Sequence, residues 1–401
     1  MSLTETNDGV GFGVDLHRFA VDPERGFLPP RDPLRQLPPT FATWEEVAAD
    51  LPKLLAQTAL ERVVARLPVL DPSGLDGAAL RRAMLLLSFI GHGYVWEKWQ
   101  TEQRDRLPAN LAVPWYQVAQ RLGRPPVLAY ASYALDNWRR LDPNGPIELG
   151  NLALLQNFLG GVDEEWFVTV HIDIEAKAGP ALEALTRAQA AVARGDLDLL
   201  TSYLERIAAV VERLGQTLAR MPEHCDPYIY YNRVRPYIHG FSQHPVIYEG
   251  VAAYQGEPRA FYGETGAQST IIPSLDAGLG IEHRPDELRV YLNYMRDYMP
   301  PEHRAFLAAI EAGPSIRAYV LEHQKEGVLV DAYNEAVHWL EAFRQRHLEY
   351  AAAYIQKQSA YSPYNSTTYG TGGTPFMPYL KKHRDETTAH QIQKVATTPH
   401  R

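Results

Sequence analysis

The clearest hydrophobic pattern in the chain runs from Asp331 to Ile355 and predicts one amphipathic helix. The residues of one face follow one another at alternating steps of four and three, as in a helix that packs against other helices. This stripe consists of Tyr333, Val337, Leu340, Arg344, His347, Ala351 and Tyr354. A buried arginine such as Arg344 must be paired, and a buried histidine such as His347 must be hydrogen-bonded or bound to a metal. The pattern alone leaves both interpretations of His347 open.

Helical periodicity also dominates the rest of the chain, whereas strand patterns are few and the sequence has no internal repeat. Further helices are predicted within residues 44–96, 127–138, 163–179, 199–221, 289–298 and 301–311, and in the segment after Phe376. The fold class that follows is all-α.

Three segments break this helical pattern. Repeated prolines in residues 1–40 exclude regular helix and predict an extended arm. DPNGP at 142–146 predicts a turn and a joint between two regions. The segment at about 357–374 is rich in Ser, Thr, Tyr and Gly and is expected to be mobile.

Composition limits the class of protein. Hydrophobic residues make up 45% of the 401 residues and charged residues 22%, as in soluble globular proteins. The net charge of -9 argues against nucleic acid or an anionic membrane as partner. No apolar run approaches the roughly 20 residues that span a bilayer, and the start lacks signal-peptide features, so we expect a cytoplasmic protein. The single cysteine, Cys225, excludes a disulfide framework and any multi-cysteine metal site.

Short catalytic motifs give little guidance, and histidines are the remaining candidates for chemistry. GTGGT at 370–374 lacks the preceding strand and the following lysine of a phosphate-binding loop, and the chain has no HExxH or GxSxG. The candidate histidines on predicted helical faces are His92, His171, His239, His303, His338 and His347. Histidine without cysteine, among apolar helices, suits haem better than structural zinc, because haem needs one axial ligand and a wide apolar slot.

Sequence blocks spread over nearly the whole chain share one order with a known family. The most specific are MRDYMPPEHR at 295–304, FRQRH at 343–347 and GTGGT at 370–374. Together they resemble the indoleamine 2,3-dioxygenase family. The resemblance implies a haem enzyme that inserts O₂ across the indole C2–C3 bond of L-tryptophan or a related indole, giving an N-formylkynurenine-type product. It also implies two helical domains, which we place at 1–125 (small, with the Pro-rich arm), 126–160 (connecting helix and joint) and 161–401 (large, haem-binding).

The resemblance also assigns residues on the two faces of a haem b group. His347 matches the proximal iron ligand, and Asp276 and Arg344 match a pair that tethers the proximal helix. On the distal side, Arg235 matches the arginine that binds the substrate carboxylate. The other implied substrate contacts are the pocket aromatics Tyr130, Tyr133, Phe167, Tyr230 and Tyr231, the loop residues Thr265 and Gly266, and the lid residue Thr371. Implied partners are O₂, a small indole and an electron donor that keeps the iron ferrous, with the protein a monomer or homo-oligomer.

Three departures from the family make the implied pocket more polar. His171 stands where many members carry serine, so it is a candidate catalytic residue that contacts the indole N–H or the oxygen. Tyr230 and Tyr231 replace the usual phenylalanines, and the loop at 263–270 has the sequence GETGAQST, where GGSAGQSS is usual. Two other hypotheses therefore stay open: a haem enzyme of this fold that performs monooxygenation or rearrangement of a tryptophan derivative, and a non-catalytic haem or O₂ carrier.

Overall fold

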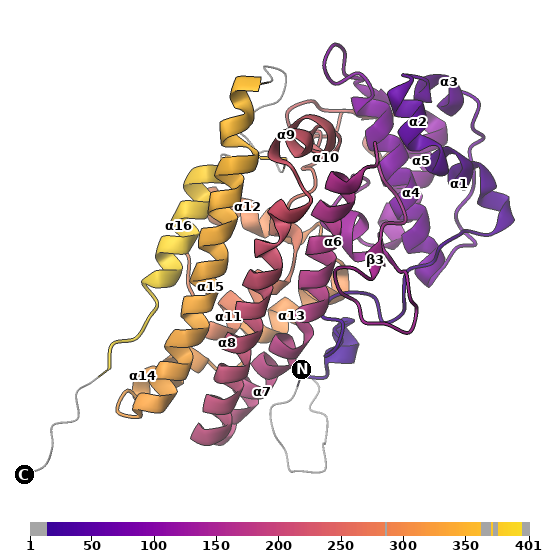
Figure 1. Cartoon of the computed structure of the whole chain (residues 1–401). Coiled ribbons are helices and arrows are strands. Elements are labelled where there is room, and N and C mark those ends of the chain that lie inside the picture. The colour runs from indigo at the N-terminus through magenta and orange to yellow at the C-terminus, as the bar shows by residue number, and fades with distance from the viewer. Residues whose placement is uncertain (1–13, 285–286, 362–369, 372–375, 395–401) are drawn as a thin grey trace, which may run out of the picture.

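A computed structural model of the protein describes residues 14–284, 287–361, 370–371 and 376–394. These residues form helices with only two short two-stranded sheets, so the predicted all-α class is confirmed (Figure 1). The α-helices are α1 (Ala42–Ala49), α2 (Leu51–Ala56), α3 (Leu60–Val64), α4 (Gly77–Trp96), α5 (Ala109–Arg121), α6 (Val162–Lys177), α7 (Gly179–Arg194), α8 (Leu197–Ala219), α9 (Pro227–Ile229), α10 (Arg235–Ile238), α11 (Ile271–Leu279), α12 (Glu287–Arg296), α13 (Pro301–Glu311), α14 (Ile316–Glu322), α15 (Gly327–Tyr354) and α16 (Phe376–Thr388).

Short elements connect these helices. The strands are β1 (Arg106–Leu107), parallel to β4 (Ile247–Tyr248), and β2 (Arg139–Arg140), antiparallel to β3 (Leu152–Ala153). Two segments are π-helical, η3 (Ala131–Leu135) and η5 (Tyr230–Val234). The 3₁₀ turns are η1 (Leu16–Phe19), η2 (Pro39–Phe41), η4 (Met221–Glu223), η6 (Ala252–Tyr254), η7 (Gly266–Gln268) and η8 (Gln356–Tyr361).

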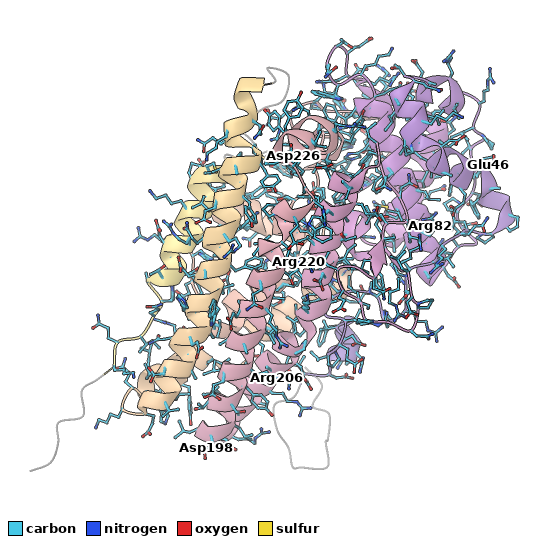
Figure 2. All side chains as sticks on the ribbon, viewed as in Figure 1. Glu46, Arg82, Asp198, Arg206, Arg220 and Asp226 are labelled. Carbon is cyan, nitrogen blue, oxygen red and sulfur yellow. The ribbon has the colours of Figure 1, made fainter. Side chains whose placement is uncertain are left out.

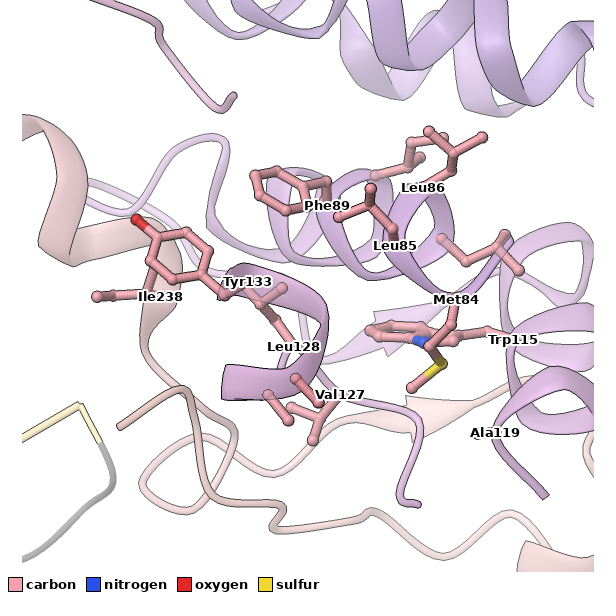
Figure 3. Close-up of a cluster of buried hydrophobic side chains, with 14 of the residues drawn as sticks. Met84, Leu85, Leu86, Phe89, Trp115, Ala119, Val127, Leu128, Tyr133 and Ile238 are labelled. Carbon is pink, nitrogen blue, oxygen red and sulfur yellow. The ribbon is translucent and has the colours of Figure 1, made fainter. Parts of the chain in front are cut away.

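The first apolar core surrounds α4, which is buried on nearly every side. Phe89 of α4 and Trp115 of α5 are fully buried in it, beside Leu128 and Tyr133 (Figure 3). Burial of each large apolar side chain contributes about 1.5–3 kcal/mol, so α4 holds this half of the molecule together.

The second core lies along α15, the longest helix, which packs lengthwise against α8 and α16 (Figure 1). Leu200, Leu204 and Leu214 of α8 are fully buried against it. The opposite face of α8 is polar: Asp198 and Arg206 are exposed and follow one another along the helix (Figure 2). This separation of apolar and polar faces is the pattern expected of a helix with one side in the core.

Helix α6 lies between the two cores and belongs to both. Val168 and Ile172 pack in the first core, whereas Val170 and Ile174 pack in the second. A helix with apolar residues all round is a buried helix. His171 is carried on this shared helix, at the junction of the two halves.

Most predicted elements are found with small shifts at their ends. The helix predicted from Asp331 to Ile355 is confirmed as α15. The buried helix predicted over 127–138 is shorter: it is the π-helical segment η3, in which the N–H of Asp136 donates to the carbonyl of Ala131 five residues earlier. None of the described helices combines the length and apolar character needed to cross a bilayer.

The predicted domain division and mobile segment remain predictions. The first core takes in Tyr237–Val251 and Leu288–Tyr298 from the second half of the sequence, so the two cores are not divided at one point of the chain. The segment predicted to be mobile, 357–374, falls largely on residues 362–369 and 372–374, which lie outside the described residues. The described arm from residue 14 to 40 has only short 3₁₀ turns, as its prolines predict.

Candidate active site

His347 differs from its neighbours on the buried face of α15. The other six members of that stripe are buried, whereas the His347 side chain is exposed. Protein nevertheless surrounds the ring closely enough that desolvation lowers its pKa to about 4. A side chain that solvent reaches and that is still desolvated lies in a recess and not on the outer surface. The imidazole is therefore neutral near pH 7 and offers a nitrogen lone pair to that recess.

His171 on α6 lies near His347. After desolvation, the charge of His171 is the second cause that lowers the pKa of His347, so the two rings are close enough to interact. The Nδ1 of His171 lies 2.7 Å from the carbonyl oxygen of Phe167, which can only accept, so Nδ1 carries the proton. Nε2 is then the hydrogen-bond acceptor. Burial lowers the pKa of His171, so this ring is also neutral near pH 7.

The predicted pair of Asp276 and Arg344 is present behind His347. Arg344 lies one turn before His347 on α15, and its Nη2 is 2.6 Å from Oδ2 of Asp276 on α11. Its Nη1 donates to the hydroxyl of Thr387 on α16 at 2.5 Å. Burial opposes ionisation of Asp276, but Arg344 and His283 outweigh it and hold the pKa of this carboxyl well below its usual range. The register of α15 is thus fixed against two other helices.

Sequence patterns did not indicate that this pair is part of a larger charge network. Nε2 of His283 is 3.1 Å from Oδ2 of Asp276, and its Nδ1 is 2.8 Å from Oε2 of Glu386 on α16. The ring of His383 packs on His283 at 4.2 Å between centroids. His283, His383 and Glu386 are close enough to hold a metal ion. Both ring nitrogens of His283, however, already hydrogen-bond to carboxylates, those of Asp276 and Glu386. We therefore interpret the cluster as an extension of the Asp276 ion pair.

Aromatic residues predicted for the substrate pocket do come together around His171. The ring of Phe167 lies 4.7 Å from His171 and 4.7 Å from Tyr230, between centroids. Tyr130 is 6.1 Å from His171, and Tyr133 is 6.4 Å from Phe167. Rings at these separations form one aromatic wall, suited to a flat apolar guest.

Both π-helical segments supply this wall. Segment η3 carries Tyr133 and follows directly on Tyr130, and η5 carries Tyr230 and Tyr231. In η5 the N–H of Arg235 donates to the carbonyl of Tyr230, five residues earlier. A π-helical turn widens the helix by one residue and is frequent at functional sites. The two short segments where the backbone departs from regular helix therefore carry Tyr133 and Tyr230 of the wall, whereas Phe167 lies on the regular helix α6.

Arg235 follows η5 and is completely buried. Its guanidinium carbon lies 5.5 Å from the centre of the Tyr231 ring. Burial lowers the pKa of Arg235, but a guanidinium stays protonated in proteins. A buried, charged fork of this kind can bind a carboxylate through two parallel hydrogen bonds.

The loop at 263–270 is held on this pocket by specific contacts. Gln268 accepts from the N–H of Tyr130 at 2.8 Å and donates to the carbonyl of Gly263 at 2.8 Å. A Cβ on Gly263 would lie 2.2 Å from the nitrogen of Gly240, so this close approach of two backbones requires glycine. The predicted lid residue Thr371 is also bound here, because its hydroxyl donates to the carbonyl of Glu264 at 2.6 Å.

The remaining members of the loop and the other histidines are placed as follows. Thr265 is half-buried and caps η7, and Gly266 is exposed beside it. His92 is fully buried with both ring nitrogens bonded, to the carbonyl of Tyr237 and the N–H of Leu128, and is a structural histidine. His338 lies exposed on α15, away from the stripe.

Sequence patterns missed two buried carboxyl groups beside the pocket. Glu175 accepts from Ser269 at 2.7 Å, and burial raises its pKa to about 7, against smaller lowering effects of Ser269 and Tyr130. Glu264 is 4% exposed, and burial raises its pKa to about 8. The difference between the loop sequence and GGSAGQSS was the one sequence feature that pointed to Glu264. The burial of Glu264 depends on contacts between segments far apart in the sequence.

The arrangement suits a haem. Among the described residues none hydrogen-bonds the His347 ring, in contrast to His92, so a neutral imidazole is left to ligate a metal. His347 and His171 come from two different helices and are close enough for their charges to interact, with the aromatic wall beside His171. One axial imidazole and an apolar surround are the protein groups that a haem requires.

Known proteins resemble this chain over nearly its whole length. A family model for indoleamine 2,3-dioxygenase matches residues 15–390. Indoleamine 2,3-dioxygenase 1 of Rattus norvegicus is 37% identical over 387 residues, covering 93% of this chain and 94% of that protein. The indoleamine 2,3-dioxygenase of Saccharomyces cerevisiae is 34% identical and covers 93% of each chain. A protein named myoglobin from Haliotis madaka is 31% identical, covering 93% of this chain and 98% of that protein. The chain belongs to the indoleamine 2,3-dioxygenase family, whose enzymes are haem-dependent oxidoreductases that oxidise tryptophan.

Proposed function

We propose that this chain binds haem b through His347 and oxidises an indole amino acid with both atoms of O₂, cleaving the C2–C3 bond. The product is of the N-formylkynurenine type. The observation that carries this proposal is the position of His347. Its imidazole is neutral, has no hydrogen bond to a described residue, lies on an otherwise buried stripe held in register by Arg344, and is close to His171.

Arg235 is proposed to bind the substrate carboxylate. The guanidinium is buried, so an anion that reaches it is desolvated and the charge-assisted hydrogen bonds are strong. A carboxylate presents two oxygens in the plane that the fork requires. This contact fixes the amino-acid end of the substrate and so sets which atoms of the indole face the recess.

His171 is proposed to accept a hydrogen bond from the indole N–H. Its Nδ1 proton is engaged by the carbonyl of Phe167, so Nε2 presents a lone pair. The low pKa caused by burial keeps that lone pair available near pH 7. His171 thereby orients the ring by hydrogen bonding without taking a proton. Phe167 and Tyr230 offer one aromatic wall against which the indole ring can lie, and Thr371 closes the loop over it.

Haem, when bound, supplies the iron that activates O₂; the protein supplies orientation and a dry surround. We further propose that an electron donor keeps the iron ferrous and that the protein works in the cytoplasm, where its single thiol stays reduced.

A non-catalytic O₂ carrier is the second candidate, because the relative from Haliotis madaka is named myoglobin. A carrier has no use for a buried carboxylate-binding arginine or for a lid contact such as that of Thr371. Both features support an enzyme that holds a second small molecule beside O₂.

The test is to incubate the reduced, haem-loaded protein with L-tryptophan and O₂ and to measure the product mass. A gain of two oxygen atoms supports the proposal. A gain of one oxygen, or a rearranged skeleton, contradicts it in favour of a haem enzyme with other chemistry. Stable O₂ binding with no product supports a carrier.

A further inference from the structure

His383 on α16 carries a buried ring nitrogen that the charge network behind His347 does not use. Its Nε2 has no hydrogen-bond partner among the described residues, although the ring packs on that of His283 at 4.2 Å between centroids. Burial is the main cause that lowers the pKa of His383 to about 3, and the charges of His283 and Arg344 lower it further. The ring is therefore a neutral imidazole near pH 7, which is the form that binds metal ions.

His283 lies between two carboxylates. Its Nε2 is 3.1 Å from Oδ2 of Asp276, and its Nδ1 is 2.8 Å from Oε2 of Glu386. Burial opposes ionisation of both carboxyl groups, but the hydrogen bonds and cations around them outweigh it, so both pKa values lie below their usual ranges. An ionised carboxylate only accepts, and a neutral imidazole has one N–H. One of the two contacts therefore needs a further positive charge between the atoms, which is either a second proton or a metal ion.

The hydrogen bond to Asp276 decides which nitrogen of His283 is left for that charge. When Nε2 donates to Oδ2 of Asp276, Nδ1 presents its lone pair toward Glu386. A histidine that binds a metal ion almost always donates its other ring N–H to a carboxylate or a carbonyl, which fixes its tautomer and orientation. An ion at Nδ1 retains the bond to Asp276 and replaces only the proton between His283 and Glu386. The network that holds α15 is thereby extended and not broken.

The loop after α11, which supplies this histidine, is fastened to α16 at two points. The N–H of Glu282 donates to Nε2 of His390 at 3.0 Å, and the N–H of Arg284 donates to Oε1 of Glu386 at 3.3 Å. His383 and Glu386 are three residues apart on α16 and therefore share one helix face. Two segments distant in the sequence thus hold their candidate ligands together through bonds of the protein itself.

We propose that His283, His383 and Glu386 bind one Zn²⁺ ion, with water as the fourth ligand. Two imidazole nitrogens and one carboxylate oxygen are ligands that zinc accepts. The ligand atoms, one from each residue, lie within 4.8 Å of one another. Tetrahedral zinc separates its ligand atoms by about 3.3 Å, so small side-chain rotations are sufficient. Lys382 lies 3.6 Å from Oε1 of Glu386, which leaves Oε2 to the ion. The ion would join the loop after α11 to α16 and so stabilise the support of α15.

The experiment is a titration of the full-length, haem-loaded protein with Zn²⁺, without a histidine tag and after treatment with a chelator. Isothermal titration calorimetry measures the number of sites and their affinity. We expect one site per chain with a Kd of about 1 µM or lower. His383→Ala should weaken it by about 100-fold or more, because even the loss of a ligand's outer partner costs about 10- to 100-fold. Glu386→Gln, which removes the carboxylate charge at similar size, should also weaken zinc binding strongly.

His338→Ala, which removes an exposed histidine of α15, is the matched control and should leave the affinity unchanged. His383→Ala removes a ring whose Nε2 has no hydrogen bond to lose, and Glu386→Gln provides the same test if that variant does not fold. Zinc should raise the midpoint of thermal unfolding of the wild type and of His338→Ala but not of the two ligand variants. Absence of zinc binding in the wild type overturns the proposal, as does a site that both ligand variants retain or that His338→Ala abolishes.

Discussion

The two sides of the candidate site differ in how completely their polar groups are bonded. Behind His347, Arg344, Asp276, His283 and Glu386 form a continuous chain of contacts between 2.6 and 3.1 Å. On the side of His171, the Tyr133 hydroxyl and the Glu264 carboxyl have no bond to a described side chain. Both sides bury charge or polarity, but the first recovers more of the cost within the protein, although Oδ1 of Asp276 and Nε2 of His383 also lack a partner there.

This difference indicates two roles: the residues behind His347 hold the helix in place, and the residues on the side of His171 recognise the ligand. A group that fixes a helix does so best when its bonds are complete before any ligand arrives, as Arg344 does for α15. A group that recognises a ligand must keep bonding capacity for that ligand. The comparison therefore predicts that changes behind His347 alter haem retention and stability, whereas changes on the side of His171 alter substrate selection.

The largest effect is expected at His347, where the two sides meet. His347→Ala should lower haem affinity by more than about 100-fold, because loss of the ligand itself exceeds the loss caused by its supporting residues. The absorption spectrum of the purified protein and haem titration measure this. His338→Ala, an exposed histidine on the same helix, is the control. If His347→Ala binds haem with an unchanged spectrum, another residue is the iron ligand, and the division of the site into a side behind His347 and a side at His171 is wrong.

Arg235→Ala tests the recognition side with the next largest effect. It should lower kcat/KM for L-tryptophan by about 30- to 1,000-fold, since a buried charge pair loses one partner. Decarboxylated indoles should show little change, because they have no carboxylate to bind. Arg206→Ala on the surface of α8 is the matched control. A similar loss for both substrate types would assign Arg235 a structural role.

Asp276→Asn tests the support side. Haem affinity should fall by about 10- to 100-fold with little change in the preference among bound indoles. The pKa of Asp276 is lower in the folded state, so its contribution to stability is complete above about pH 4 and is lost as the pH falls toward the folded pKa. The difference in free energy of unfolding between wild type and Asp276→Asn should therefore shrink as the pH is lowered from neutrality.

Chemical unfolding at several pH values measures this difference. The control is Asp331→Asn, which breaks the exposed ion pair between Asp331 of α15 and Lys394. A difference that grows on acidification would show that Asp276 is not the anionic member of the network.

The smallest effect is expected at His171. His171→Ala should lower kcat/KM for L-tryptophan by about 3- to 10-fold, the value of one neutral hydrogen bond, and should not affect the N1-methylated substrate. The pKa of His171 is lowered, so its acceptor form persists as the pH falls through the usual histidine range. Wild-type kcat/KM should accordingly stay level between about pH 8 and pH 6.5. An equal loss for the N1-methylated substrate would place His171 away from the indole N–H.

Local patterns were sufficient where a residue's neighbours in sequence are also its neighbours in space. The stripe of α15 predicted the helix, its buried face and the polar pair one turn apart. Family resemblance supplied Asp276, Arg235 and the pocket aromatics, which periodicity could not connect. The prediction over 127–138 was too long because the widened turn of η3 depends on how Tyr130 and Tyr133 pack, and hydrophobic spacing does not register a π-helical bond.

By itself, the sequence determined an all-α chain, a long helix carrying His347 on its buried face, and the exclusion of a multi-cysteine metal site. Those follow from residue spacing and residue type. Only the tertiary structure decided that His347 alone among its stripe is exposed, that His283 and Glu386 extend the Asp276 pair, and that the Glu264 carboxyl is buried without a bond to a described side chain. Each of these depends on contacts between segments distant in the chain, and burial and pairing are properties of such contacts.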